Sequence, residues 1–250
     1  MMRKIAILLS MSVLMLLTVS GMALAADEEA ICMEVGGEWT SGLYRCSFFE
    51  FGENSHGIEY SYQYRFPTRI ASDPFIQNAI SNYMQRMIEE FMGGVEMTTD
   101  APGALFLETE YEIFYYKPHI VSIAFFTSTY MGGASPHLVV DAMTFDTERE
   151  QVLGLDDLFV GDVDYLPTIK AAVQADLVDQ LGEDLRDFIE AGTGDDPANY
   201  NRFTITDDAL IFFFSQGDVA PRAAGPRSAE VLLSDLGSIW ALDVVAGPAQ

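Results

Sequence analysis

Two residues in one glycine-rich bend have the types and spacing of a reactive pair. In the segment YMGGASPH, Ser135 lies two residues from His137. A serine beside a histidine can act as a nucleophile with its general base. Neighbouring loop residues seldom reach that geometry, however, and no G-x-S-x-G motif surrounds Ser135. We therefore interpret Gly132-Gly133 as a tight turn between strands and expect no catalytic residue here.

The histidines are too few and too scattered to form a catalytic metal centre. His56, His119 and His137 are the three in the chain, and no HExxH or His-x-His motif is present. A catalytic zinc ion usually has three protein ligands, so we expect no metal and no cofactor. The loop at 192–201 resembles a calcium loop only in composition, because it lacks the ligand spacing of an EF-hand, and calcium binding there is left open.

Acidic residues dominate the charge of the 250-residue chain. It has 13 Lys and Arg against 38 Asp and Glu, a net charge of −25. Such a surface disfavours nucleic acid and favours cationic partners, although a solvated surface suited to a saline medium would have the same composition. With 38 carboxylates, some Asp/Glu pair always has the spacing of a glycosidase, so that spacing carries little information.

The first 25 residues have the pattern of a secretory signal peptide. Arg3 and Lys4 precede an apolar stretch at 5–19, and Ala23-Leu24-Ala25 fits the small-x-small rule for cleavage. Nothing later approaches the roughly 18 apolar residues of a membrane span. We expect cleavage near Ala25 and a periplasmic or secreted protein without a membrane span, its net charge then being −27 because two basic residues leave with the peptide.

The two cysteines, Cys32 and Cys46, predict a disulfide. An exported chain with two cysteines has one pairing available, and turn residues between them let the chain double back. A zinc site is disfavoured, because two thiols without a nearby histidine supply half a ligand set. We expect residues 26–56 to form a small segment stapled by this bond.

Periodicity predicts an α+β fold. Residues 58–66 alternate aromatic and polar side chains, as in a half-buried strand. Asp73-Pro74 predicts the start of a helix and Gly93-Gly94 its end. A second helix is expected up to Phe188, capped by Asp162 or Asp164. Further strands are expected at 105–116, 119–130, 138–145, 203–206, 209–214 and 228–233.

These elements form two successive units of a helix packed on an antiparallel sheet. The expected boundaries are a signal peptide at 1–25, the stapled segment at 26–56, an N-terminal α+β domain at 57–150 and a C-terminal one at 151–245. The stretch 130–159 is then the joint between the two halves.

A series of short motifs follows in a fixed order along the chain. They are Tyr130-x-Gly132-Gly133-Ala134-x-Pro136, Phe145-Asp146, Leu155-x-Asp157-Leu158-Phe159, Phe203-x-Ile205-Thr206-x-Asp208-x-Leu210 and Val219-Ala220-Pro221-x-Ala223-Ala224-Gly225. This order resembles the RsiV-like extracytoplasmic module of bacteria, a pair of domains of unknown function, and the resemblance covers roughly residues 57–236.

The resemblance implies an α+β binding module. Modules of this kind form the lysozyme-sensing ectodomain of an anti-sigma factor and precede some peptidoglycan deacetylase domains. This chain departs from the pattern at Ser135, where the family commonly has histidine, at Glu150, where it has glycine, and at Gly217 and Arg222, where it has aromatic residues. The sequence shows no transmembrane helix, no cytoplasmic sigma-binding segment and no deacetylase domain, so we expect neither the sigma-binding role nor the deacetylase role here.

We expect a non-catalytic binding protein of the cell envelope. A cationic protein such as lysozyme is the first expected partner, peptidoglycan the second. The alternatives are an accessory or glycan-acting cell-wall enzyme that uses Asp or Glu, and an acidic envelope protein with no specific partner. The expected binding surface comprises Tyr130, Gly132, Gly133, Ser135, His137, Asp218 and Arg222.

Overall fold

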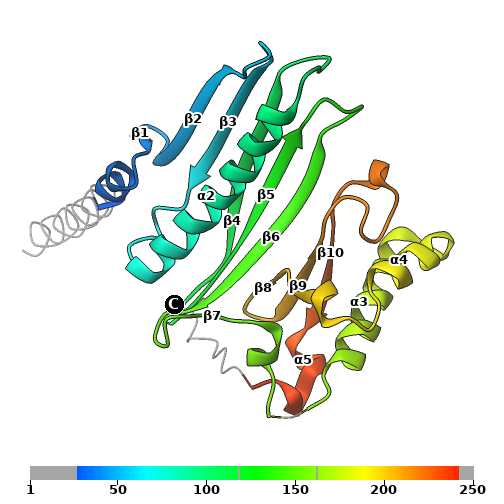
Figure 1. Cartoon of the computed structure of the whole chain (residues 1–250). Helices are drawn as coiled ribbons and strands as arrows, with labels where there is room; N and C mark the ends of the chain where they lie inside the picture. The colour runs from blue at the N-terminus through cyan, green and yellow to red at the C-terminus, as the bar shows by residue number, and fades with distance from the viewer. Residues whose placement is uncertain (1–26, 118, 162, 242–250) are drawn as a thin grey trace, which may run out of the picture.

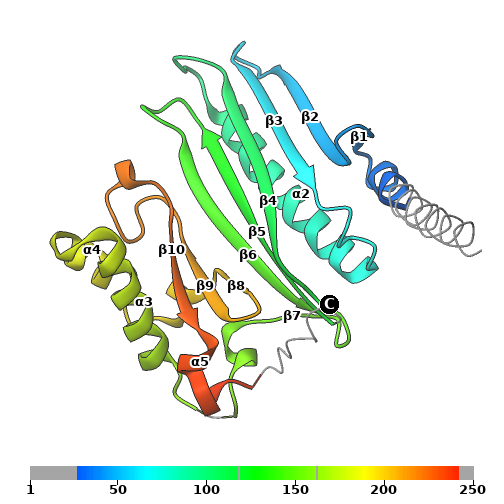
Figure 2. The same cartoon turned by 180° about the vertical axis from the view of Figure 1, so that it is seen from behind.

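The computed structural model describes residues 27–117, 119–161 and 163–241. It has the α+β fold expected from the sequence, arranged as a helix, a large sheet, a small sheet and a further helical layer (Figures 1 and 2). The expected signal peptide and its cleavage site lie outside the described residues. None of the helices in the described ranges is long and apolar enough to cross a membrane.

The large sheet has seven strands in chain order. They are β1 (Glu38–Thr40), β2 (Arg45–Glu53), β3 (Glu59–Phe66), β4 (Leu105–Lys117), β5 (Ile120–Tyr130), β6 (His137–Asp146) and β7 (Gln151–Val152). Neighbouring strands are antiparallel except β3 and β4, which are parallel. The sheet is therefore mainly antiparallel, as expected. The parallel pair β3 and β4 is joined through helix α2 (Pro74–Met97), because parallel neighbours require a long crossover connection.

Helix α2 covers one face of the large sheet. Asp73 caps it by accepting a hydrogen bond from the backbone N–H of Phe75 at 2.8 Å, and Pro74 occupies the first turn, as the sequence predicts. Its buried residues are Ile76, Ile80, Met84, Phe91 and Val95. They pack against inward-facing residues of β4, β5 and β6, and this packing forms the core of the first unit.

The predicted end of α2 at Gly93-Gly94 is wrong, because the helix continues for three more residues to Met97. Glycine costs about 1 kcal/mol in a helix, which burial of the flanking Phe91 and Val95 offsets. A Cβ added at Gly94 would lie 2.8 Å from Cε of Met131. The small residue at position 94 therefore admits a side chain from the β5–β6 loop.

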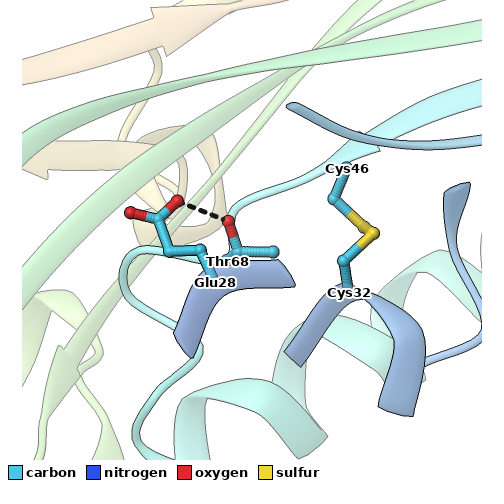
Figure 3. Close-up of a disulfide and its surroundings, with 4 residues drawn as sticks. All are labelled: Glu28, Cys32, Cys46 and Thr68. Carbon is cyan, nitrogen blue, oxygen red and sulfur yellow. Dashed lines mark hydrogen bonds between the residues drawn. A yellow bond between two sulfur atoms is a disulfide. The ribbon is translucent and has the colours of Figure 1, made fainter. Parts of the chain in front are cut away.

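The disulfide between Cys32 and Cys46 is present, as predicted. It joins a helical segment at 27–34 to β2, and Thr68 donates a hydrogen bond to Glu28 at 2.8 Å beside it (Figure 3). Both cysteines are buried in the same core as α2. The stapled segment is not a separate appendage, since its strands β1 and β2 belong to the large sheet.

The second unit packs on the opposite face of the large sheet. Its three-stranded sheet has the order β10 (Arg227–Leu232), β9 (Ala209–Phe214), β8 (Phe203–Ile205), and α3 (Leu166–Leu181), α4 (Arg186–Gly192) and α5 (Leu233–Leu236) complete it. Phe213 packs edge-on against Phe114 and Phe126 and contacts Ala124 and Val140 of the large sheet. Strand β7 lies just after the expected boundary at 150/151 but belongs to the large sheet of the first unit. The boundary between two domains at 150/151 stays a prediction.

The single helix predicted up to Phe188 is wrong, because it breaks into α3 and α4 at Gly182. Gly182 has φ of +88°, a conformation that favours glycine. The predicted cap at Asp164 is also wrong. Helix α3 begins after Tyr165 and has no side-chain cap, while Asp162 lies outside the described residues.

Glu150 also has a left-handed backbone, with φ of +50°. This is the position where the resembling family has glycine, which adopts that conformation without strain. Glu150 therefore stands in a conformation that non-glycine residues seldom adopt.

A close backbone approach joins α4 to the loop after β9. A Cβ at Gly192 would lie 2.1 Å from the carbonyl oxygen of Asp218, whereas the nearest atom to a Cβ at Gly194 is 3.7 Å away. We expect Gly192→Ala to lower the free energy of unfolding by about 1–3 kcal/mol through overpacking, measured by urea denaturation. Gly194→Ala is the matched control, and equal midpoints for the two variants would contradict this packing.

Candidate binding cavity

A cavity separates the C-terminal half of α2 from the large sheet. Its volume is about 700 Å³. Residues of α2, of strands β4 to β6 and of the β5–β6 loop line it: Met87, Glu90, Phe91, Gly94, Leu107, Thr127, Thr129, Met131, Gly133, Ser135, His137, Val139 and Asp141. The predicted site loop thus lies at one end of the largest of the described pockets.

Strand and helix periodicity brings these side chains together. His137, Val139 and Asp141 alternate along β6 and share one face. Met87 and Phe91 are one helical turn apart on α2 and face that strand. Apolar side chains of α2 and the sheet thus line much of the cavity, and His137 and Asp141 place polar groups at the two ends of this β6 segment. Further polar side chains of the lining are Glu90, Thr127, Thr129 and Ser135.

Hydrogen bonds fix the inner polar end of the cavity. The Tyr83 hydroxyl donates to Oδ2 of Asp141 at 2.8 Å. The hydroxyls of Thr109 and Thr127 lie 3.1 Å apart, and both approach Sδ of Met87 at 3.5 Å. Burial raises the pKa of Tyr83 far above its ordinary value, and the charge of Asp141 adds to the shift. Tyr83 therefore stays a hydrogen-bond donor at physiological pH.

Arg222 determines the tautomer of His137 at the outer end. Nη1 of Arg222 lies 3.1 Å from Nδ1 of His137. A guanidinium group has only donors, so Nδ1 must be the acceptor and the imidazole proton is on Nε2. In that form Nε2 can donate a hydrogen bond but cannot take a proton from Ser135.

The loop after β9 holds Arg222 in place. Gln216 donates through Nε2 to the carbonyl oxygen of Arg222 at 2.8 Å. Its Oε1 accepts from the backbone N–H of Leu138 at 3.1 Å, and its own N–H donates to the Leu138 carbonyl at 3.0 Å. These contacts tie the second unit to the first residues of β6, which explains how Arg222 reaches His137 across 85 positions of sequence.

Asp218 has a structural role in the same loop. Its Oδ2 accepts hydrogen bonds from Nη1 of Arg202 and from the backbone N–H of Ser215, both at 2.8 Å. The hydroxyl of Ser215 in turn accepts from the backbone N–H of Val140 at 3.1 Å. The hydrogen bonds of Asp218 therefore stabilise the position of this loop next to β6.

The structure brings together four of the seven residues expected at the surface. Gly133, Ser135 and His137 line the cavity, and Arg222 contacts His137. Tyr130 stacks on Phe106, with ring centroids 5.7 Å apart, and is not among the lining residues. Gly132 forms the turn, with φ of +92°. Whether this surface binds a ligand stays a prediction.

Sequence reasoning missed the inner residues of the cavity. The helical spacing of Tyr83, Met87 and Phe91 indicated a core face, and nothing in that pattern distinguishes a filled core from a partly open one. Asp141 could have been identified from the sequence, because it is a carboxylate at a position where the predicted strand faces inward. A polar residue at such a position requires a partner or a ligand.

No metal centre emerges from the parts of the chain that the structure describes, since no three His, Cys, Asp or Glu residues there are grouped to hold an ion. His119 and His137 do not meet, because His119 precedes β5 whereas His137 pairs with Thr129 near the other end of that strand. In the loop at 192–201, Asp195 pairs with Lys170 at 2.6 Å and Asp196 caps the turn that follows.

Two protein families match separate parts of the chain. Residues 53–137, which form β3 to β5 and α2, match the family "Deacetylase PdaC". Residues 156–234, which form most of the second unit, match the family "Protein of unknown function (DUF3298)". The paired arrangement expected from the motif order is therefore found, while identity with the RsiV type stays a prediction.

The chain is also similar in sequence to individual proteins of known name. The chain is 27% identical to the immunogenic protein MPT64 of Mycobacterium tuberculosis over 241 residues, covering 95% of this chain and all of that one. It is 39% identical over 101 residues to Esterase Rv3036c of the same species, covering 40% of this chain and 44% of that one. It is 25% identical over 191 residues to the peptidoglycan-N-acetylmuramic acid deacetylase PdaC of Bacillus subtilis, covering 72% of this chain and 39% of the deacetylase.

Solved structures share the fold. A DUF3298 family member from Bacteroides fragilis superposes with a TM-score of 0.58 at 16% identity, covering 83% of this chain and 94% of that one. A DUF3298 family protein from Pseudomonas aeruginosa gives 0.56 at 14% identity, covering 81% and 95%. At these identities the likeness concerns the fold alone.

The Tyr83–Asp141 contact predicts how stability depends on pH. Because the pKa of Tyr83 is raised on folding, its contribution is complete below pH of about 10, where an unfolded tyrosine ionises, and is lost as pH rises further. We expect Tyr83→Phe to make the fall in the free energy of unfolding above pH 10 less steep, by at most about 1.4 kcal/mol per pH unit. Urea titrations at several pH values measure this, and parallel slopes for the two proteins would contradict it.

Proposed function

We propose that this protein is a non-catalytic, exported binding module associated with the bacterial cell wall. The observation that carries the proposal is the open cavity of about 700 Å³ beneath α2. Its size suits a small ligand or one group of a larger one. Its polar groups are arranged to donate and accept hydrogen bonds, and the Nε2–H tautomer of His137 supports binding over proton transfer.

The two ends of the cavity favour a ligand that carries an amide. Nε2–H of His137 offers a donor, and Asp141, which meets Tyr83 through Oδ2, has lone pairs on Oδ1 to accept. An acylated amine presents a C=O acceptor, an N–H donor and an apolar acyl group, and Phe91 and Val139 offer apolar surface between the ends. Peptidoglycan carries such groups on its sugars and peptides.

The similar proteins support a role at the cell wall. The match to the PdaC family covers α2 and two of the strands that line the cavity, β4 and β5, and one relative is described as a peptidoglycan deacetylase. This chain covers well under half of that enzyme, so its activity does not transfer. The buried disulfide is typical of an oxidising compartment, which supports a periplasmic or secreted location.

Filling the cavity should weaken binding. Thr129 faces the cavity, whereas the adjacent Ser128 is not among its lining residues. We expect Thr129→Phe to weaken binding of soluble muropeptides at least about tenfold, an energy of about 1.4 kcal/mol, measured by isothermal titration calorimetry. Ser128→Phe is the matched control. Equal affinity of both variants, or no binding of muropeptides by the parent protein, would refute this assignment.

A cationic wall-active protein of the lysozyme type is the second proposed partner. The net charge of −25 would steer such a protein to this one and orient it. The rim formed by Ser135, His137 and Arg222 would then act as the contact surface.

Binding of this partner should depend on salt. We expect the mature protein to co-elute with lysozyme at low ionic strength and to release it as salt rises towards about 1 M, where the screening length is about 3 Å. Size-exclusion chromatography measures this, with a neutral protein of equal size as the control. Absence of co-elution at low salt would exclude lysozyme, and equal retention of the neutral protein would favour an acidic protein without a specific partner.

Ester hydrolysis is a second candidate function. The observation in its favour is that Ser135 and His137 line one cavity, in a chain similar over 101 residues to a protein described as an esterase. Against it stand the contact of Arg222 with Nδ1 and the engagement of Asp141 by Tyr83. Hydrolysis of p-nitrophenyl acetate that disappears in Ser135→Ala would overturn the non-catalytic assignment.

A glycan-acting enzyme would instead require carboxylates. Glu90 and Asp141 both line the cavity, and Glu90 is exposed. New products from peptidoglycan fragments, seen by mass spectrometry and absent in Asp141→Asn, would favour this alternative over binding alone.

A further inference from the structure

One edge of the large sheet is open along six residues of β2. Strand β1 pairs with β2 only at positions 45–47. Residues 48–53 pair with β3 on one side, and no strand of the described ranges pairs with them on the other. Figure 1 shows β2 at the outer margin of the sheet, with the short β1 beside only one end of it. Alternate N–H and C=O groups of this edge therefore point outward.

The open edge carries two exposed aromatic side chains. Phe49 and Phe51 are 61% and 75% exposed, and their ring centroids lie 5.8 Å apart. They share the face of the strand opposite Phe48, which stacks on Tyr64 at 4.3 Å in the core. Natural edge strands are usually protected by short length, proline or charged side chains, and the charges on this edge are Glu50 and Glu53. Phe49 and Phe51 form an exposed apolar pair beside them.

The edge is held in the conformation that strand addition needs. Asn54, which is buried, follows β2 and donates through Nδ2 to the carbonyl oxygens of Val95 and Thr98, both at 2.8 Å. Its Oδ1 accepts from the backbone N–H groups of His56 at 2.9 Å and Ile58 at 3.0 Å. The β2–β3 turn is thereby fixed to the end of α2, which lowers the ordering cost of binding.

A second pocket adjoins the end of this edge and carries two carboxylates. It has a volume of about 610 Å³, and Phe51, Glu53 and Glu59 are among its lining residues. Glu53 and Glu59 are direct cross-strand partners, an arrangement in which like charges destabilise the pair. No ion pair of the described residues includes either of them. A lysine or arginine from outside could pair with both carboxylates and reduce their repulsion while its stem lay on Phe51.

We propose that residues 48–53 bind an extended segment of a cationic partner polypeptide by strand addition. The added strand places apolar side chains on Phe49 and Phe51 and a basic side chain in the pocket of Glu53 and Glu59, while its backbone pairs with β2. A second copy of this chain is disfavoured as the occupant, because each molecule carries a net charge of −25.

The probe is the labelled peptide acetyl-Lys-Thr-Val-Thr-Val-Thr-Lys-amide, which presents lysine and valine on one face. Fluorescence anisotropy with the mature protein at low ionic strength should show saturable binding. A peptide with glutamate in place of lysine, and one with proline in place of the central threonine, should each bind at least about tenfold more weakly, since one loses the charge and the other a backbone donor. Equal binding of all three peptides would overturn the proposal.

Variants locate the peptide on the protein. Phe49→Ser with Phe51→Ser, and Glu53→Gln with Glu59→Gln, should each weaken binding at least about tenfold. Phe188→Ser on α4 and Glu230→Gln on β10, both at exposed positions of the other unit, are the matched controls. Circular dichroism confirms that each variant is folded. Unchanged affinity in both edge variants would overturn the proposal.

Amide hydrogen exchange distinguishes strand addition from binding by charge alone, because only strand addition protects the backbone N–H groups of the edge. Bound peptide should slow amide hydrogen exchange at residues 48–53, and protection confined to other segments would overturn strand addition. The cavity variant Thr129→Phe should bind the peptide as the parent does, so that failure of the cavity assignment and failure of this one are separable. A dimer in sedimentation velocity that disappears in Phe49→Ser with Phe51→Ser would assign the edge to a second copy and overturn the proposal.

Discussion

The structure depends on burial of the central strands β5 and β6 on both faces. Five consecutive residues of β5, positions 121–125, are buried, which an ordinary two-layer sheet would not permit. Phe125 faces Tyr83 of α2 on one side, and Ala124 faces Phe213 of the second sheet on the other. The buried hydroxyl of Ser122 is hydrogen-bonded. It accepts from the backbone N–H of Ile205 at 2.9 Å and lies 2.7 Å from the hydroxyl of Thr144. Neither unit could be removed without exposing apolar surface of these strands.

The cavity and the open edge both follow from this arrangement. Only the N-terminal part of α2 is pressed against the doubly covered strands. Towards Gly94 the helix lies above the part of the sheet where Met131 and the β5–β6 loop intervene, and a cavity results. The second unit covers β5 and β6 but leaves β2 at the far margin, where the short β1 protects only three positions. The two proposed binding surfaces thus lie outside the region that stabilises the fold.

Charge and geometry have separate roles in the proposed functions. The net charge of −25 acts at a distance and favours any cationic partner, so it cannot select one. Selection requires short-range groups: the Nε2–H of His137 and the carboxylate of Asp141 in the cavity, and the facing Glu53 and Glu59 at the edge. In each place a polar group is positioned by contacts from another part of the chain.

Sequence patterns were sufficient to predict the local features of this protein. The Asp73-Pro74 start of α2, the disulfide between Cys32 and Cys46 and most of the strands were predictable, because capping, cysteine pairing and period-two patterns act over a few residues or have a single solution. The sequence did not reveal the extension of α2 past Gly93, the parallel pairing of β3 with β4, or the inner residues of the cavity. Those depend on which surfaces meet. Only the tertiary structure placed Arg222 on His137, since a contact across 85 residues depends on how two sheets pack and not on any local preference of the chain.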